Sequence, residues 1–248
     1  RSGHDAAGLE RRENCVDGAI IMENVKRILC YGDSNTWGTI AEAEETDAPS
    51  RRYPQDVRWP GVMAKALGDG FLVIEDGVEG RTTIYPSDDT PLTRGDIHLR
   101  DSLWQNRPVD LVLLKLGVND LKQVFHPRRE HLADGMQQLI DIVRSCSDCG
   151  RNGIPPEILL VAEAPILKPI GRQLFYESRG RENGCTLSRE FAKDYRMLAE
   201  KNACYFADAG IVGENDPADG LHLSRESHSK VGKYLAAIVS DICSKSEV

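Results

Sequence analysis

The chain has 248 residues, of which 40% are hydrophobic, and its formal net charge is −8. This length fits one large domain that encloses its own core. The acidic balance argues against nucleic acid as a partner, because phosphate recognition needs clustered Lys and Arg. No apolar run approaches the roughly 20 residues that a membrane-spanning helix needs, so we also expect no membrane partner.

The first 21 residues are polar and charged, and they lack the apolar stretch of a secretory signal. We interpret residues 1–21 as an N-terminal extension that is flexible or foreign to the natural protein. Residues 22–248 then form a single domain, with Met22 just before the first strand-like segment. The seven cysteines are an odd number in a long chain, which argues against a disulfide framework and favours a reduced, cytoplasmic setting.

Cys146 and Cys149 have the spacing of a metal or redox pair. A structural zinc site needs about four ligands, and no second such pair or nearby pair of histidines completes one. We therefore expect neither a metal nor a cofactor.

Short apolar runs alternate along the chain with stretches of helical period. Five runs predict strands, at residues 27–31, 71–75, 109–116, 158–163 and 204–206. Most are continuous rather than alternating, which is typical of strands buried on both faces of a parallel sheet. Amphipathic helical faces begin at Trp59, Leu132 and Val231. The alternation predicts a three-layer α/β/α sandwich with a mostly parallel five-stranded sheet.

Three stretches fit neither pattern, namely residues 39–55, 85–94 and 165–184. Long irregular segments in a compact domain are often functional loops. These segments either line a pocket or form subunit contacts. The equally weighted alternative is that they are surface loops without a functional role.

Ser34 follows the first predicted strand directly, in the sequence Gly32-Asp33-Ser34. In an α/β sheet, ligands bind beyond the carboxyl ends of the strands. A serine there can act as a nucleophile if a base takes its proton. Taken alone, a serine at such a junction is more often a helix cap.

Asp219 and His222 lie just before the last amphipathic segment, with Ser224 as a candidate N-cap of that helix. On a tight turn the carboxylate can reach one ring nitrogen, so that the other nitrogen faces a serine hydroxyl. The alternative is a turn-capping aspartate beside a surface histidine.

Two further elements follow predicted strands. The side-chain amide of Asn119 can donate a hydrogen bond to a developing oxyanion, or the residue can cap a turn. Gly77 and Gly80 follow strand 71–75, and a glycine there lets a backbone N–H approach a ligand. Spacing alone does not choose between the two glycines.

The order of these elements resembles the SGNH, or GDSL-like, hydrolase family from about Arg27 to the last helix. Similarity is closest to its arylesterase/acyltransferase branch, through three segments: Thr36-Trp37-Gly38, Asp56-Val57-Arg58-Trp59 and Gly80-Arg81-Thr82-Thr83. Asn35 departs from the family pattern, which has Leu there, and Gly80 stands where the branch can have Ala. Neither departure removes a catalytic group.

The resemblance implies a flavodoxin-like fold and a Ser34–His222–Asp219 triad. It implies that the oxyanion hole consists of the N–H groups of Ser34 and Gly80 and the side chain of Asn119. It further implies a serine esterase that hydrolyses short-chain, acetyl-type esters, with possible acyl transfer to alcohols. The partners implied are a small-molecule ester substrate and other copies of the chain in a homo-oligomer.

Asp33, Trp37 and Trp59 are candidate pocket residues, with plain core packing an equal alternative for Trp59. Two other functions stay open. One is a carbohydrate deacetylase or lysophospholipase on the same fold, and the other is an α/β binding protein without catalysis.

Overall fold

The structure is a computed structural model that describes residues 25–42, 44, 51–86 and 93–245. The predicted extension at residues 1–21 lies outside these residues. The strands are β1 (Lys26–Gly32), β2 (Phe71–Gly77), β3 (Leu111–Lys115), β4 (Glu157–Ala162) and β5 (Tyr205–Asp208). They form one sheet in the order β2-β1-β3-β4-β5, and every pairing is parallel. The predicted fold class is confirmed, and this strand order is the flavodoxin-like one.

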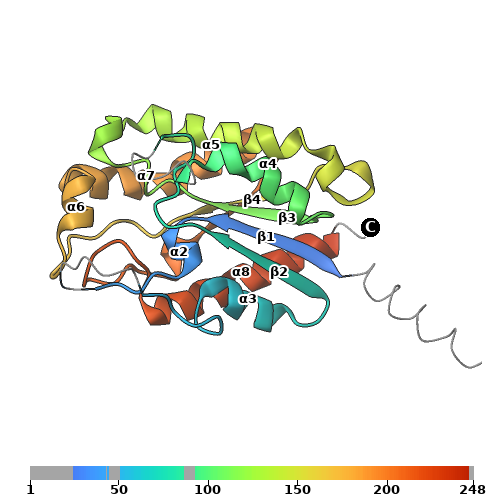
Figure 1. Cartoon of the computed structure of the whole chain (residues 1–248), viewed down its shortest axis with the longest axis horizontal. Coiled ribbons are helices and arrows are strands. Elements are labelled where there is room, and N and C mark those ends of the chain that lie inside the picture. Colours follow the sequence, from blue (N-terminus) through green and yellow to red (C-terminus); the bar gives the residue numbers. More distant parts are fainter. Residues whose placement is uncertain (1–24, 43, 45–50, 87–92, 246–248) are drawn as a thin grey trace, which may run out of the picture.

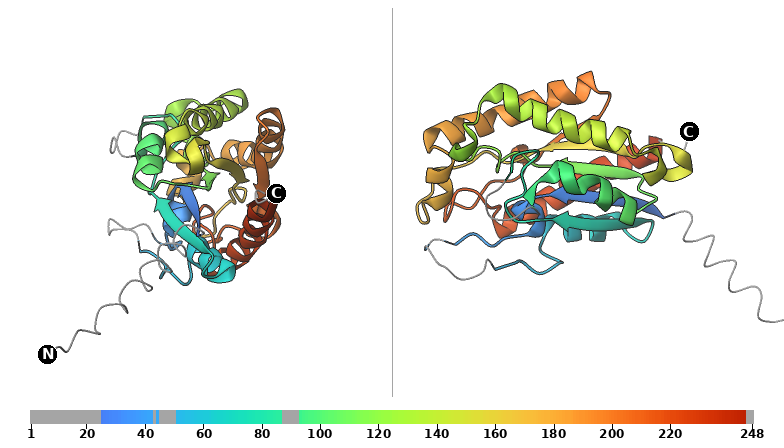
Figure 2. Two further views of the ribbon diagram at one scale, coloured as in Figure 1. Left: turned by 90° about the vertical axis from the view of Figure 1, so that its right-hand side faces the viewer. Right: turned by 45° about the horizontal axis from the view of Figure 1, so that its top comes forward.

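Helices cover both faces of the sheet (Figures 1 and 2). One layer holds α4 (Gly95–Gln105), α5 (Arg129–Arg144) and α7 (Glu182–Lys201), and the other holds α3 (Trp59–Leu67) and α8 (Arg225–Lys245). Two short helices, α2 (Ser34–Trp37) and α6 (Leu174–Ser178), lie at the carboxyl ends of the strands. Short 3₁₀ segments are η2 (Gln123–Phe125), η3 (Ser147–Cys149), η4 (Arg151–Gly153) and η5 (Ala209–Ile211).

Alternate strand residues point into two separate cores. Leu29 and Tyr31 pack under α4, α5 and α7, whereas Ile28 and Cys30 pack against α3 and α8. Both cores consist of buried apolar side chains, which explains why the strands are continuous apolar runs. Buried side chains on both faces hold the sheet rigid, and a rigid sheet fixes the loops at its carboxyl ends.

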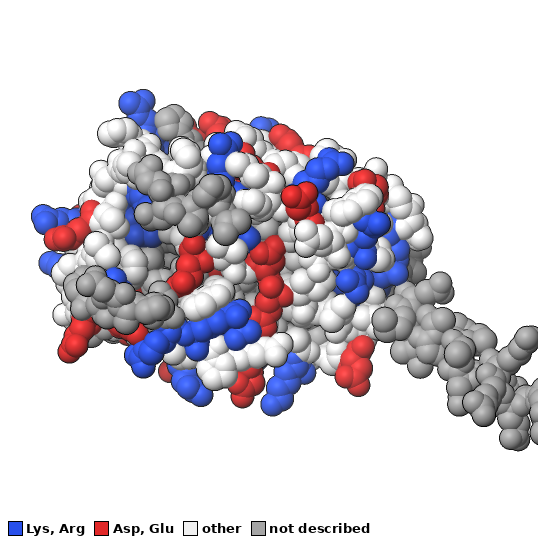
Figure 3. Space-filling model, viewed as in Figure 1, with Lys and Arg blue, Asp and Glu red and all other residues white. Residues whose placement is uncertain are grey.

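Those loops gather at the left of Figure 1, around α2 and α6. In the part of the chain that the structure describes, no helix is both long and apolar enough to cross a membrane. Acidic and basic side chains are interspersed on the face shown in Figure 3.

Candidate active site

Ser34 is the first residue of α2, directly beyond strand β1. Asp33 caps this short helix, since its carboxylate accepts a hydrogen bond from the Asn35 N–H at 2.9 Å. The turn is tight because Gly32 has no side chain: a Cβ there would lie 2.0 Å from Thr36 Oγ1. Strand, cap and helix together present the Ser34 hydroxyl at the sheet edge, in the position that the sequence predicts.

Asp219 and His222 lie on the loop that precedes α8. The Asp219 Oδ1 atom accepts the backbone N–H groups of Leu221 and His222, at 2.9 and 3.0 Å. Its Oδ2 atom lies 2.7 Å from His222 Nδ1. Gly220 has φ 73°, and a Cβ there would lie 2.2 Å from Leu167 O, so this turn requires glycine. The carboxylate thus fixes both the turn and the orientation of the imidazole.

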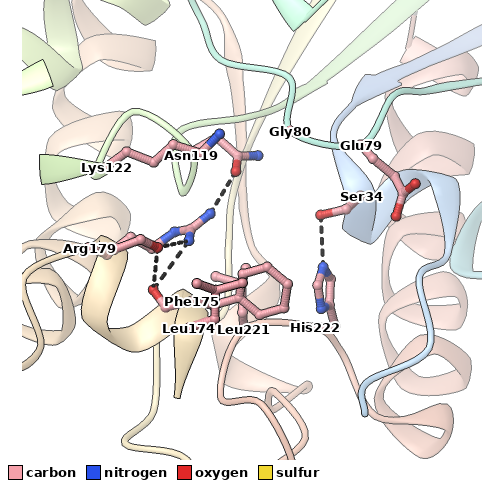
Figure 4. A pocket seen from close by; sticks show the side chains of 11 residues that line it. Ser34, Glu79, Gly80, Asn119, Lys122, Leu174, Phe175, Arg179, Leu221 and His222 are labelled. Carbon is pink, nitrogen blue, oxygen red and sulfur yellow. Dashed lines mark hydrogen bonds between the residues drawn. The ribbon is translucent and has the colours of Figure 1, made fainter. Parts of the chain in front are cut away.

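The other ring nitrogen, His222 Nε2, lies 3.1 Å from Ser34 Oγ (Figure 4). Burial alone would raise the pKa of Asp219, but hydrogen bonds from His222 and the backbone lower it below its usual value. The carboxylate is therefore ionised and accepts the Nδ1 proton, which leaves Nε2 free to accept the serine proton. Three side chains from distant parts of the sequence form one hydrogen-bonded chain.

Asn119 lies on the turn beyond β3, and its amide faces the same space as Ser34 (Figure 4). Its Oδ1 atom accepts a hydrogen bond of 2.7 Å from Arg179 Nη2. Its Nδ2 atom donates to Arg81 O at 3.1 Å and to Asp33 Oδ2 at 3.4 Å. Because a guanidinium only donates, Arg179 fixes which end of the amide carries the N–H groups.

The two candidate glycines have different surroundings. A Cβ on Gly77 would lie 2.2 Å from Trp37 N, so Gly77 allows α2 to pack closely on the end of β2. Gly80 has φ 74° and lines the same cavity as Ser34 and Asn119. This placement favours Gly80 as the backbone donor, in line with the family resemblance.

A cavity of about 470 Å³ opens over Ser34. It is lined by Ser34, Glu79, Gly80, Asn119, Lys122, Leu174, Phe175, Ser178, Arg179, Leu221 and His222. Four of these belong to or flank α6, inside the irregular segment 165–184 that the sequence marks as a candidate pocket wall. The Phe175 ring stands edge-on to His222, with the ring centroids 5.1 Å apart.

Three predicted pocket residues do not line this cavity. Trp59 is fully buried and packs in the core beneath α8, so the core-packing alternative is the one observed. Trp37 is half-buried, and its ring faces the guanidinium of Arg52. Asp33 is fully buried beneath Ser34, where it caps α2. A residue next to Ser34 in the sequence therefore need not point into the cavity above Ser34.

Two buried charged residues escaped the sequence analysis. Lys115 Nζ and Glu163 Oε2 lie 2.6 Å apart, and each side chain is 1% exposed. Lys115 lowers the pKa of Glu163 despite its burial. Asp33 hydrogen-bonds the same glutamate, and burial together with the charge of Glu163 raises the pKa of Asp33 well above its usual value. The pKa values of these two neighbouring acids are therefore shifted in opposite directions, up for Asp33 and down for Glu163.

Arg179 was also missed, although it contacts the predicted oxyanion donor. Its guanidinium donates to Val118 O at 3.0 Å as well as to Asn119, and the residue is 2% exposed. Burial lowers the pKa of Arg179 to about 10, so it stays charged at neutral pH. The one sequence signal was an arginine beside aromatic residues in an irregular segment, which does not specify a contact 60 residues away.

A model of the family described as GDSL-like Lipase/Acylhydrolase matches residues 30–230. The chain belongs to this family. A carbohydrate acetylesterase from Sinorhizobium meliloti is 35% identical, with a TM-score of 0.81 over 88% of this chain and 99% of that one. An aryl esterase from M. smegmatis is also 35% identical, with a TM-score of 0.80 over 88% of this chain and 99% of that one.

An acetylxylan esterase from Xylanibacter ruminicola is 24% identical over 238 residues, which cover 88% of this chain. The match covers 44% of that relative, so the chain spans less than half of its length. The family and the similar proteins confirm the predicted class of enzyme: this GDSL-like hydrolase is a carboxylic ester hydrolase.

Proposed function

We propose that this hydrolase cleaves short-chain, acetyl-type esters through a triad of Ser34, His222 and Asp219. One observation carries the proposal: Ser34 Oγ, both His222 nitrogens and Asp219 Oδ2 form a continuous chain with contacts of 3.1 and 2.7 Å. A serine hydroxyl becomes a good nucleophile when such a base accepts its proton.

In the acylation half-reaction, Ser34 Oγ attacks the ester carbonyl while His222 Nε2 takes the hydroxyl proton. The negative charge that develops on the carbonyl oxygen is held by the N–H groups of Ser34 and Gly80 and by Asn119 Nδ2. The contact of Nδ2 with Asp33 is long, at 3.4 Å, so this N–H can turn toward the oxyanion. His222 then gives its proton to the alkoxide, which leaves as the alcohol.

In the second half-reaction, water attacks the acyl-serine while His222 takes a water proton, and the acid leaves as Ser34 recovers its hydrogen. An alcohol can take the place of water, and the product is then a new ester. The cavity favours this competition, since Leu174, Phe175 and Leu221 supply apolar wall beside His222. We therefore extend the proposal to acyl transfer, which a rise in ester product with alcohol concentration would test.

The decisive experiment compares wild type and Ser34→Ala with p-nitrophenyl acetate. We expect wild type to turn over and the variant to lose activity by a factor on the order of 10³ or more. Ser188→Ala is the matched control, because Ser188 is equally buried but bonds Cys185 O and the Ile166 N–H outside the cavity. Equal activity in wild type and Ser34→Ala would reject the triad and favour a non-catalytic binding protein.

A second candidate substrate class is acetylated carbohydrate. The polar side chains Glu79, Lys122 and Arg179 line the cavity, and sugar hydroxyls need such hydrogen-bonding partners. The names of two similar proteins, a carbohydrate acetylesterase and an acetylxylan esterase, support this class. A higher kcat/KM for acetylated xylo-oligosaccharides than for aryl acetates would favour it, and the reverse order would favour small aryl esters.

A further inference from the structure

The side chain of Asn35, the residue after Ser34, reaches across to the loop that carries His222. Its Oδ1 atom accepts the Leu223 N–H at 2.8 Å, and its Nδ2 atom donates to Leu221 O at 3.2 Å. These two backbone groups stand on either side of His222. Asn35 is 2% exposed, so neither bond can be replaced by water without opening the site.

The loop that carries His222 makes other backbone hydrogen bonds, but these connect it to a segment other than α2. Leu167 N donates to Gly220 O, and Arg172 N donates to Ala218 O, which ties the loop to the segment before α6. Among the residues that the structure describes, hydrogen bonds from this loop to the α2 segment come from Asn35 and from the Ser34–His222 contact itself. Asn35 therefore supplies the side-chain hydrogen bonds, besides the Ser34–His222 contact, that connect the α2 segment to the loop of His222.

The buried Glu163 carboxylate determines the orientation of the Asn35 amide. Its Nδ2 atom also donates to Glu163 Oε2 at 3.2 Å, and Lys115 Nζ donates to the same oxygen at 2.6 Å. A flipped amide would place its oxygen against the Glu163 carboxylate and against Leu221 O, and its NH₂ against the Leu223 N–H. Lys115 keeps Glu163 ionised, and the ionised glutamate permits one orientation only.

We propose that Asn35 is a positioning residue that sets the contact between Ser34 and His222, and that the buried Lys115–Glu163 pair orients its amide. This inference rests on the triad of the proposed function. It assigns a role to the position at which the chain departs from the Leu of the family pattern. An amide can bridge a carbonyl and an N–H at once, and leucine can do neither.

The first test is Asn35→Leu, which keeps a similar volume and removes all three hydrogen bonds. We expect kcat for p-nitrophenyl acetate to fall by roughly 10²-fold, as for a small misplacement of reacting groups, with KM changed less than about threefold. The rate of Ser34 labelling by a fluorophosphonate should fall in parallel, because that reaction also needs proton transfer to His222.

The second test exchanges the two partners. Asn35→Asp alone keeps an acceptor for the Leu223 N–H but sets a carboxylate against Glu163, so kcat should fall. Adding Glu163→Gln removes the second carboxylate, and the glutamine oxygen can still accept the hydrogen bond from Lys115 Nζ at that position. We expect the double variant to regain at least tenfold of the kcat lost by Asn35→Asp. A merely destabilised fold would give additive losses and no such recovery.

Leu139→Ala is the control for stability, because Leu139 is fully buried in the core under α5, outside the cavity. It should lower Tm at unchanged kcat.

A crystal structure of Asn35→Leu gives a readout independent of activity: we expect the Ser34 Oγ to His222 Nε2 distance to exceed 3.5 Å. An unchanged distance, or wild-type kcat in Asn35→Leu, would overturn the inference while leaving the triad intact. Loss of activity in Ser34→Ala with wild-type behaviour in Asn35→Leu separates the two proposals.

Discussion

Both ends of the sheet hold an ion pair, but they differ in burial. At the amino ends, Arg151 forms two hydrogen bonds to Asp110, at 2.7 and 2.8 Å, and these side chains are 29% and 12% exposed. At the carboxyl ends, Lys115 and Glu163 are each 1% exposed. The first pair is partly hydrated, whereas the second depends wholly on its protein neighbours for compensation.

The two ends of the sheet also differ in the pKa values of their carboxyl groups. Although burial opposes it, the pKa of Asp110 lies below its usual value because Arg151 and the Arg27 N–H bind the carboxylate. At the carboxyl ends, burial raises the pKa of Asp33 and of Asp120, whereas Lys115 keeps the pKa of Glu163 below its usual value. The end of the sheet that carries Ser34 therefore holds buried acids with raised pKa values beside a fully buried ion pair, where electrostatic effects are strongest. Four substitutions test this contrast.

Asp219→Asn should have the largest effect. The amide would donate to His222 Nδ1, so the proton of the neutral ring would shift to Nε2, which then could not accept the proton of Ser34. We expect kcat to fall by about 10³- to 10⁴-fold with the fold intact. Steady-state hydrolysis of p-nitrophenyl acetate measures it.

The control for that prediction makes the same chemical change nearby. Asp216 Oδ1 accepts the Ala218 N–H at 2.9 Å, so Asp216→Asn alters a capping carboxylate of the same loop. Its kcat should stay within about threefold of wild type, since a surface-side cap contributes little to the reacting atoms. A loss of less than tenfold in Asp219→Asn would contradict the triad.

The fold could be predicted from the sequence where the apolar pattern is undisturbed. All five strands, and the helices α3, α5 and α8, coincide with apolar runs or helical faces. Helix α4 was missed because Ile97 and Trp104 are about half exposed and blur its buried face. Helix α7 was missed because Gly184 and Ser188 interrupt its apolar stripe. Tertiary packing determines these helices more than local pattern does.

The site was predictable where its residues form short local motifs. Ser34, Asn119 and the Asp219–His222 turn each follow a strand or precede the last helix, so their type and place can be inferred from sequence. Lys115 could not, because a lysine at a strand end is ordinarily a solvated residue. Its partner Glu163 lies 48 residues later, and no local pattern links the two. Contacts between adjacent strand ends need the sheet order.

Lys115→Met should have the next largest effect, on stability. It leaves the Glu163 carboxylate buried without its cation, and breaking a buried pair in this way costs about 3–5 kcal/mol. Adding Glu163→Leu should recover most of this loss, because an apolar pair of similar volume removes the uncompensated charge. Urea unfolding of wild type, single and double variants measures it. Equal stability in wild type and Lys115→Met would show that water reaches this end of the sheet.

Asp120→Asn tests the pH dependence that burial imposes at the same end. Asp120 accepts the Thr83 N–H and Oγ1–H at 2.8 and 2.5 Å, yet its burial raises its pKa to about 7. An acid with a raised pKa in the folded state stabilises the fold at low pH and loses that contribution as pH rises. Between pH 4 and 7 the loss approaches about 1.4 kcal/mol per pH unit.

The asparagine oxygen can still accept the Thr83 N–H and its NH₂ can donate to Thr83 Oγ1, with that bond reversed. Because the asparagine does not titrate, the variant should lack this slope. Unfolding free energies at pH 4.5, 5.5 and 6.5 compare the two proteins. Parallel slopes in wild type and variant would mean that Asp120 ionises as freely in the fold as in the unfolded chain.

Asp110→Asn should give the smallest effect, with the opposite pH dependence. Because the pKa of Asp110 is lowered in the fold, its contribution is present above the unfolded pKa of about 3.9 and is lost as pH falls through the folded pKa. At pH 7 we expect the variant to lose about 1–2 kcal/mol, since Arg151 and the Arg27 N–H lose a charged acceptor. Near pH 2 the difference from wild type should vanish.

The same variant should keep wild-type kcat, because Asp110 lies at the opposite end of the sheet from Ser34. Urea unfolding at pH 7 and pH 2, together with p-nitrophenyl acetate turnover, tests both statements. A fall in kcat at unchanged stability would mean that the two ends communicate through the strands. The expected result is wild-type kcat together with a loss of stability at pH 7 that disappears at pH 2. This result would mean that Asp110 and Arg151 stabilise the fold without affecting the reaction, in contrast to the buried charges near Ser34.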